Sequence, residues 1–420
     1  MDLDGGKEGK RRKCKIEDDQ PKSGMGSLPH DVTLDIISRL PITSVLQFRF
    51  VSRAWNELSH NPSLVELQFL KTVKNNPCLL LHCDYPIRNE LYFVELSDHL
   101  GKEVARKIRL PFQDKMPEFN VIASCNGLLC LSDSMYGDPL WIFNPFTREC
   151  KLLARSRQFD DQVVAFGFGF HPATKEYKVV KLVFYWNRWN QYDASPLYRG
   201  RRLGGHTESE VQVLSLKDTN WRSLGKVPFQ LEPRAPEAAV VNGRLHWMAR
   251  CQVPSGVKTR SIFSFDLGDE QFREVPKPDC GGLERCNYHL TVLGGCLSAV
   301  VWRPCRRFLE IWVMKVYGVK ESWIKEFCIR VDYPEFIKKQ SPKPYRIWKN
   351  VLNQRFVRVL CLLKNGNILI EYKGGILVSH DPLAGNFQKL MFEGMPDMFR
   401  TVVHVGSLNW IGTTTFTQTN

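Results

Sequence analysis

The residues of this sequence that could carry out chemistry are scattered, and none belongs to a recognised catalytic pattern. His171, His246 and His289 lie in segments with no evident nucleophile partner. Gly167-Phe168-Gly169 lacks the third glycine and the following helix that a dinucleotide-binding loop requires. No G-x-S-x-G, H-E-x-x-H or paired-carboxylate pattern is present. The sequence therefore predicts a protein that is not an enzyme and needs no cofactor.

The acidic residues and the cysteines have structural explanations. Four aspartates are interpreted as turn residues that bond their own backbone: Asp133, Asp138, Asp266 and Asp269. The thirteen cysteines include no C-x-x-C pair, and the pairs Cys78/Cys83 and Cys125/Cys130 have no histidine cluster beside them. We interpret the cysteines as small buried apolar residues in a reducing compartment, and we expect no metal site.

One segment combines the side-chain types that dominate protein–protein contacts, which are aromatic residues and arginines. It lies between two expected strands and contains Arg188, Trp189, Arg199, Arg201 and Arg202. A second basic region runs from Lys338 to Lys349. The hypothesis is that an acidic or phosphorylated protein substrate binds this basic face. A long disordered loop is the alternative for the first segment.

Length and composition limit the classes of protein. A chain of 420 residues is long enough for two domains, and its 43% hydrophobic and 24% charged residues are typical of soluble globular proteins. No apolar run is long enough for a membrane-spanning helix. The net charge of +14 belongs to residues 71–420, because residues 1–27 carry +1 and residues 28–70 carry −1. Such a charge attracts acidic partners, but no nucleic-acid-binding module is recognisable.

Residues 1–27 form a polar tail without the apolar core of a secretory signal peptide. Its basic cluster consists of Lys10, Arg11, Arg12, Lys13 and Lys15. The cluster is typical of a nuclear import signal, and it is equally compatible with a disordered solvated tail. We expect the protein in the nucleus, the cytoplasm or both.

Residues 28–70 predict a compact helical module. Apolar residues at helical spacing predict one helix over about 31–39 and a second after Pro41. A third helix follows Ser52, a suitable N-cap, and ends at Asn61-Pro62. About forty residues lie near the lower limit for an independent core, so the module cannot hide all its apolar side chains. Either a second protein or the rest of the chain must cover part of them.

The amino-acid sequence of this module resembles the F-box motif from end to end. Leu28-Pro29, Arg39-Leu40-Pro41, Val51-Ser52-Arg53 and Trp55 all have the expected spacing. Phe50 stands where plant members often have cysteine, a difference expected to alter packing rather than binding. The resemblance implies helix-to-helix binding of a Skp-family adaptor through these residues: Leu28, Pro29, Val32, Ile36, Leu40, Pro41, Leu46, Val51 and Trp55.

Residues 76–420 predict an all-β domain, because short apolar runs are separated by Gly, Asn, Asp and Pro. Asn-Gly turns suited to tight hairpins occur at 126–127, 242–243 and 365–366. A strand, a polar turn and a short strand recur in four segments: 142–148, 213–221, 265–272 and 380–387. A period of about forty to sixty residues is typical of propellers. We count six blades, which start near residues 77, 121, 164, 239, 290 and 356, with residues 402–411 as candidates for closing the ring. A two-sheet sandwich array is the alternative.

Five blocks in this region resemble the plant F-box-associated domain: Ser124–Leu131, Phe143–Arg148, Gly167–Lys181, Val241–Trp247 and Phe263–Phe272. The resemblance covers residues 121–275 well and residues 276–420 loosely. His171 stands where aspartate is usual, so that turn is expected to be capped differently. Gly-Gly pairs hint at kelch repeats, but the tyrosines and tryptophans of that family are missing, and no WD signature occurs. The expected fold is a small all-α F-box module followed by a kelch-like propeller.

The two resemblances together imply the substrate-recognition subunit of an SCF-type ubiquitin ligase. Such a chain binds a Skp-family adaptor and, through it, a cullin, while other subunits perform the chemistry. It holds a protein substrate near the charged ubiquitin-conjugating enzyme and raises its effective concentration. The alternative is an F-box protein that acts as a non-degradative scaffold or nuclear regulator. A propeller that binds nucleic acid is a third reading, for which the sequence shows no stacking platform.

Overall fold

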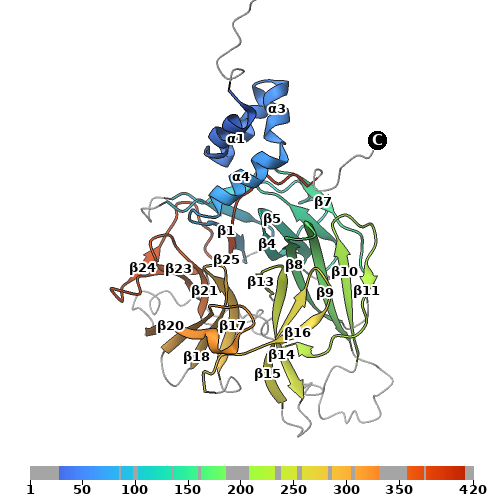
Figure 1. Cartoon of the computed structure of the whole chain (residues 1–420), viewed down its shortest axis with the longest axis vertical. Coiled ribbons are helices and arrows are strands. Elements are labelled where there is room, and N and C mark those ends of the chain that lie inside the picture. Colours follow the sequence, from blue (N-terminus) through green and yellow to red (C-terminus); the bar gives the residue numbers. More distant parts are fainter. Residues whose placement is uncertain are drawn as a thin grey trace, which may run out of the picture.

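The computed structural model describes residues 28–411, with gaps at 85–86, 98–102, 135–136, 159–161, 186–207, 232–237, 253–257, 282–285, 304–307, 331–356 and 373–374. The hypotheses on the tail 1–27, on the segment with Arg188, Trp189, Arg199, Arg201 and Arg202, and on the basic region from Lys338 to Lys349 fall outside the described residues. The described residues form a helical module on top of a β-propeller (Figure 1).

The first three helices of the module begin where the sequence predicts. Helix α1 (His30–Ser38) and helix α2 (Ile42–Gln47) each follow a proline N-cap, Pro29 and Pro41. A short 3₁₀ turn, η1 (Phe48–Phe50), leads to helix α3 (Arg53–Ser59). The predicted cap of α3 is confirmed, because the Ser52 hydroxyl accepts a hydrogen bond of 3.3 Å from the Trp55 amide.

A fourth helix, α4 (Pro62–Thr72), corrects the sequence-based account of this module. Asn61-Pro62 ends α3, as expected, but it also begins α4. The Asn61 carboxamide oxygen accepts hydrogen bonds from the amides of Ser63 and Leu64, and proline at the first helical position has no amide hydrogen to leave unpaired. Helix α4 packs along α1 and leads directly into the first blade.

The β domain contains six antiparallel sheets among the described residues, which confirms the six-bladed propeller. Blade 1 consists of β25 (Phe399–His404), β1 (Cys78–Cys83), β2 (Leu91–Val94) and β3 (Arg106–Ile108); blade 2 of β4 (Phe119–Cys125), β5 (Leu128–Asp133), β6 (Leu140–Phe143) and β7 (Cys150–Leu152). Blade 3 consists of β8 (Val163–His171), β9 (Glu176–Tyr185), β10 (Glu208–Ser215) and β11 (Arg222–Ser223).

In blade 4, two short strands pair with the same neighbour: β12 (Gln230–Leu231) and β13 (Ala239–Val241) both bond β14 (Arg244–Gln252), which is followed by β15 (Lys258–Asp266) and β16 (Phe272–Val275). Blade 5 consists of β17 (Asn287–Leu293), β18 (Cys296–Arg303), β19 (Phe308–Met314) and β20 (Trp323–Arg330), after the 3₁₀ turn η4 (Lys320–Ser322). Blade 6 consists of β21 (Val357–Leu362), β22 (Ile368–Tyr372), β23 (Ile376–His380) and β24 (Phe387–Leu390).

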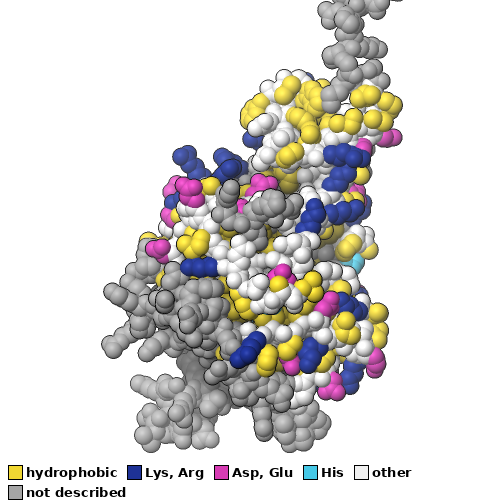
Figure 2. All heavy atoms as spheres, turned by 90° about the vertical axis from the view of Figure 1, so that its left-hand side faces the viewer, with side chains coloured by type: hydrophobic (Ala, Val, Ile, Leu, Met, Phe, Trp, Pro, Cys, Tyr) yellow, Lys and Arg dark blue, Asp and Glu magenta, His cyan; other side chains and the backbone are white. Residues whose placement is uncertain are grey.

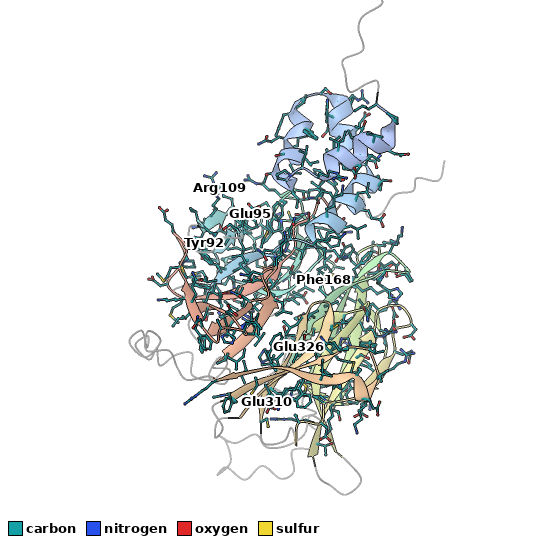
Figure 3. The ribbon with its side chains drawn as sticks, turned by 60° about the vertical axis from the view of Figure 1, so that its left-hand side comes forward. Tyr92, Glu95, Arg109, Phe168, Glu310 and Glu326 are labelled. Carbon is teal, nitrogen blue, oxygen red and sulfur yellow. The ribbon has the colours of Figure 1, made fainter. Side chains whose placement is uncertain are left out.

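The blades are held together by apolar cores at their interfaces. Leu79 and Leu81 of β1 face the core shared with blade 6, whereas Leu80 faces the core shared with blade 2. Phe168 is fully buried between blades 2 and 3 (Figure 3). A central strand that is buried on both faces needs a continuous apolar run, which explains sequences such as that of β1.

The ring closes between the two ends of the propeller. The C-terminal strand β25 pairs with β1 along its whole length, from Cys78 opposite His404 to Cys83 opposite Phe399. The prediction that the end of the chain closes the ring is therefore confirmed, but with different bounds. Residues 405–411 leave the sheet and continue toward the helical module.

Three buried histidines make the folded chain sensitive to acid. Burial lowers the pKa of His82 and of His404 to about 3 and that of His246 to about 4, against an ordinary value of 6.5. Below pH 6.5 these histidines bind protons in the unfolded chain but not in the folded chain. The free energy of unfolding therefore decreases as the pH falls. Between pH 6.5 and about 5, we predict a loss of about 2 kcal/mol per histidine in the free energy of unfolding, measured by urea unfolding.

The variant His82→Gln is the control for this prediction. It removes one titrating group, so its unfolding free energy should depend less steeply on pH than that of the original chain, whatever its absolute stability. An equally steep dependence in both chains would contradict the assignment.

A candidate adaptor-binding surface

Helix α1 carries apolar side chains on two sides. Val32 and Ile36 of α1 are each 44% exposed, and Leu28 just before the helix and Leu40 just after it, which continue the spacing of four residues, are 41% and 36% exposed. Leu34 and Ile37 lie on the other side of the helix and are buried. We call the first set the α1 stripe. Figure 2 shows hydrophobic side chains gathered on the outside of the helical module.

Phe50 and Val51 add a second exposed apolar site at the end of η1. Phe50 is 77% exposed, and the guanidinium of Arg49 lies 4.7 Å from the centre of its ring. The expectation that Phe50 alters packing inside the module is therefore wrong, because its ring points outward. The sequence could not predict that Phe50 is exposed, because η1 interrupts the helical periodicity from which an inward or outward position is inferred.

The predicted adaptor contacts divide into an outer and an inner set. The outer set is exposed: Leu28, Pro29, Val32, Ile36, Leu40, Pro41 and Val51. In the inner set, Leu46 is a correction to the expected surface, whereas the adaptor contact of Trp55 stays a prediction. Leu46 is buried, and the half-buried Trp55 packs edge-on against Phe48 with ring centres 4.5 Å apart. Both side chains stabilise the module's own core, because α2 and α3 turn these positions toward it.

A small charged network holds α1 in place. Asp35 pairs with Lys71 of α4 at 2.7 Å and with Arg39 at 2.8 Å. The hydrogen bond from Lys71, and then that from Arg39, hold the pKa of the Asp35 carboxyl below its ordinary value of 3.8. The bond from Lys71 joins α1 to α4, and the α1 stripe is therefore presented on a helix that is tied to its neighbour.

Several of the polar residues noted in the sequence prove to be turn and core residues, but Asp138 does not fit the prediction, because its carboxylate bonds the side chains of Ser156 and Gln158. The buried His246 bonds the carbonyl of Ala239 and the hydroxyl of Tyr317. His171 caps its own turn, because its Nδ1 accepts a hydrogen bond from the Thr174 amide, as expected for a turn that lacks aspartate. Asp266 accepts hydrogen bonds from the amides of the turn that follows it. In the described part of the chain, no cluster of metal-ligating side chains is found.

The predicted substrate segment is attached to the far end of the propeller. Tyr177, near the start of β9, bonds Asn409 close to the helical module, and β9 runs from there away from the module. The ends of β9 and β10 that flank residues 186–207 therefore lie on the opposite side from the α1 stripe (Figure 1). No described helix is long and apolar enough to cross a membrane.

Comparisons with known proteins agree with this architecture. The F-box-like family model matches residues 25–70, and the model of the F-box associated beta propeller domain matches residues 79–401. F-box protein At3g07870 of Arabidopsis thaliana is 48% identical over 413 residues, which cover 96% of this chain and 97% of that protein.

Two further Arabidopsis thaliana relatives are more distant. F-box protein CPR1 is 26% identical over 403 residues, covering 91% of this chain and 89% of its own length. F-box/kelch-repeat protein At3g23880 is 25% identical over 324 residues, covering 72% and 79%. With both family models matched in order along the chain, this protein belongs to the plant F-box proteins that carry an F-box-associated β-propeller domain.

Proposed function

We propose that this protein is the substrate-recognition subunit of an SCF-type ubiquitin ligase. The observation that carries the proposal is the α1 stripe, which leaves four large apolar side chains uncovered while the opposite side of the same helix is buried. An exposed apolar row on a short helix favours helix-to-helix binding of a partner. The family's F-box implies that this partner is a Skp-family adaptor.

The chain's own contribution is proximity. The α1 stripe lies at one end of the molecule, and the described ends of β9 and β10 that flank residues 186–207 lie at the other end. A protein bound to the far face would be held at a fixed position relative to the adaptor and the cullin. Transfer of ubiquitin would then depend on the raised effective concentration of that protein at the ligase.

The charge of residues 71–420 favours an acidic or phosphorylated substrate. The four arginines Arg188, Arg199, Arg201 and Arg202 are proposed contacts. Reversing all four to glutamate should lower substrate recovery in pull-downs while leaving adaptor binding unchanged. Unchanged substrate capture would reject this segment as the binding site.

A charged side chain in the α1 stripe tests the adaptor interface. Ile36→Asp places a carboxylate in a surface that must lose water on binding, which costs about 3 kcal/mol or more. We expect adaptor affinity, measured by calorimetry, to fall at least about a hundredfold.

Val163→Asp is the matched control, because Val163 is 47% exposed at the start of β8, away from the helical module. It should bind the adaptor like the original chain. Equal affinities for Ile36→Asp and the original chain would refute the proposed interface.

Proximity labelling separates the degradative role from a scaffold role. In cells expressing the original chain, labelled substrates should increase when the proteasome is inhibited. The Ile36→Asp variant should label the same proteins without that increase. Labelled proteins whose abundance does not respond to inhibition in either case would instead indicate a non-degradative scaffold.

A further inference from the structure

Residues 405–411 form a buried segment without regular secondary structure between the propeller and the helical module. Ser407 and Leu408 are fully buried, and Trp410 and Ile411 nearly so. A buried irregular segment needs partners for its backbone groups, and these partners show what holds it. We call it the C-terminal strap.

Blade 2 holds the strap from the propeller side. The Asn144 side chain donates to the carbonyl oxygens of Ser407 and Asn409, at 3.2 and 2.7 Å. The carboxylate of Glu149 accepts a hydrogen bond of 2.7 Å from the Ile411 amide. The carbonyl of Asn126 accepts from the side chains of Ser407 and Asn409, at 2.8 and 2.7 Å. The strap is thus fixed to two turns of blade 2, and Asn409 also donates to the Tyr177 hydroxyl of blade 3.

The helical module lies on the other side of the strap. Leu408 and Trp410 share one apolar core with α1, α2 and α4, including Ile37, Val45 and Leu64, which are all fully buried. The indole of Trp410 stacks on the His60 ring with centres 3.9 Å apart, and its N–H donates to the Ser59 carbonyl at 3.4 Å. These residues complete a core that the helices leave open.

The fit at this junction is tight. A side chain at Gly406 would place its Cβ 2.6 Å from the ring of Phe146 and 2.8 Å from Ile42, so a larger residue there would require these two side chains, on the blade 2 turn and on α2, to shift. At Gly127, whose φ is +83°, a Cβ would lie 2.0 Å from the Ser407 hydroxyl. The strap is therefore in close contact with both parts of the molecule.

We propose that Leu408 and Trp410 are positioning residues for adaptor binding, which rests on the function proposed above. They touch no adaptor surface. They cover the inner side of α1 and thereby hold the α1 stripe outward on a folded module. Helices of this total length have too small a core to fold reliably alone, and the strap supplies the missing apolar cover.

The strap also links adaptor binding to closure of the propeller. It follows β25 directly in the chain, so the pairing of β25 with β1 places it beside the module. Binding of the adaptor favours the folded module, the folded module favours the seated strap, and the seated strap favours the closed ring. Such coupling is reciprocal, so each event strengthens the other.

Substitutions at Trp410 test the proposal in the full-length chain. In Trp410→Ala, amide hydrogen exchange in α1, α2 and α3 should speed up. Adaptor affinity should fall at least about tenfold, because a smaller fraction of the molecules has the module folded and able to bind. Trp410→Phe keeps the ring on His60 and should restore most of the affinity. Trp312→Ala truncates a half-buried tryptophan of blade 5 and should leave adaptor affinity unchanged.

The effect of adaptor binding on ring closure gives a second measurement. Added adaptor should slow amide exchange in β25 and β1 of the original chain, but not in Trp410→Ala. The proposal is overturned if Trp410→Ala binds the adaptor normally, if Trp312→Ala weakens binding as much, or if the adaptor does not protect the closing strands. Normal binding by Ile36→Asp would instead reject the adaptor interface itself, independently of the strap.

Discussion

Helix α1 is apolar on two sides, and this requires two different covers. The inner side, with Leu34 and Ile37, is buried by the other helices and by Leu408 and Trp410 from the end of the chain. The outer side is left to water. A nine-residue helix with both sides exposed would be unstable in isolation, since helices of this length depend on tertiary packing. Covering one side with the other helices and the strap is what allows the other side to remain available.

The propeller provides a rigid support for this arrangement. Each pair of neighbouring blades shares an apolar core, and the pairing of β25 with β1 joins the last core to the first. The turns of blade 2 that hold the strap, around Asn126 and Asn144, belong to the blocks that resemble the F-box-associated domain. Those blocks therefore hold the strap in place in addition to forming one blade. Asn144 caps its own turn through its oxygen and bonds the strap through its nitrogen.

The features that were predictable from the sequence depend on local signals. Asn-Gly turns fix tight hairpins, so the positions of β4–β5, β13–β14 and β21–β22 followed from three dipeptides. The helix cap at Ser52 was equally local. The outermost strands β3 and β20 are poorly predicted by the sequence, because exposed charged residues interrupt their apolar pattern.

Of the features that were missed, one had a local signal and the others depend on long-range contacts. Helix α4 had a local signal, since asparagine followed by proline is a good helix start as well as a stop. The role of Leu408 and Trp410 had none, because their partners are more than three hundred residues away in the chain. The inward position of Leu46 could not be separated from the outward position of Ile36 by helical spacing alone. The substrate residues from Arg188 to Arg202 stay predictions.

The central claim is that α1 turns one apolar side to a core shared with the other helices and the C-terminal strap, and keeps the other side for a partner. Hydroxyl-radical footprinting of the full-length chain, with and without a Skp-family adaptor, tests it most directly. The account predicts that Val32, Ile36 and Leu40 are oxidised in the free chain and protected in the complex, while Leu34 and Ile37 stay protected in both. Protection of Ile36 in the free chain, or its continued oxidation in the complex, would contradict the account.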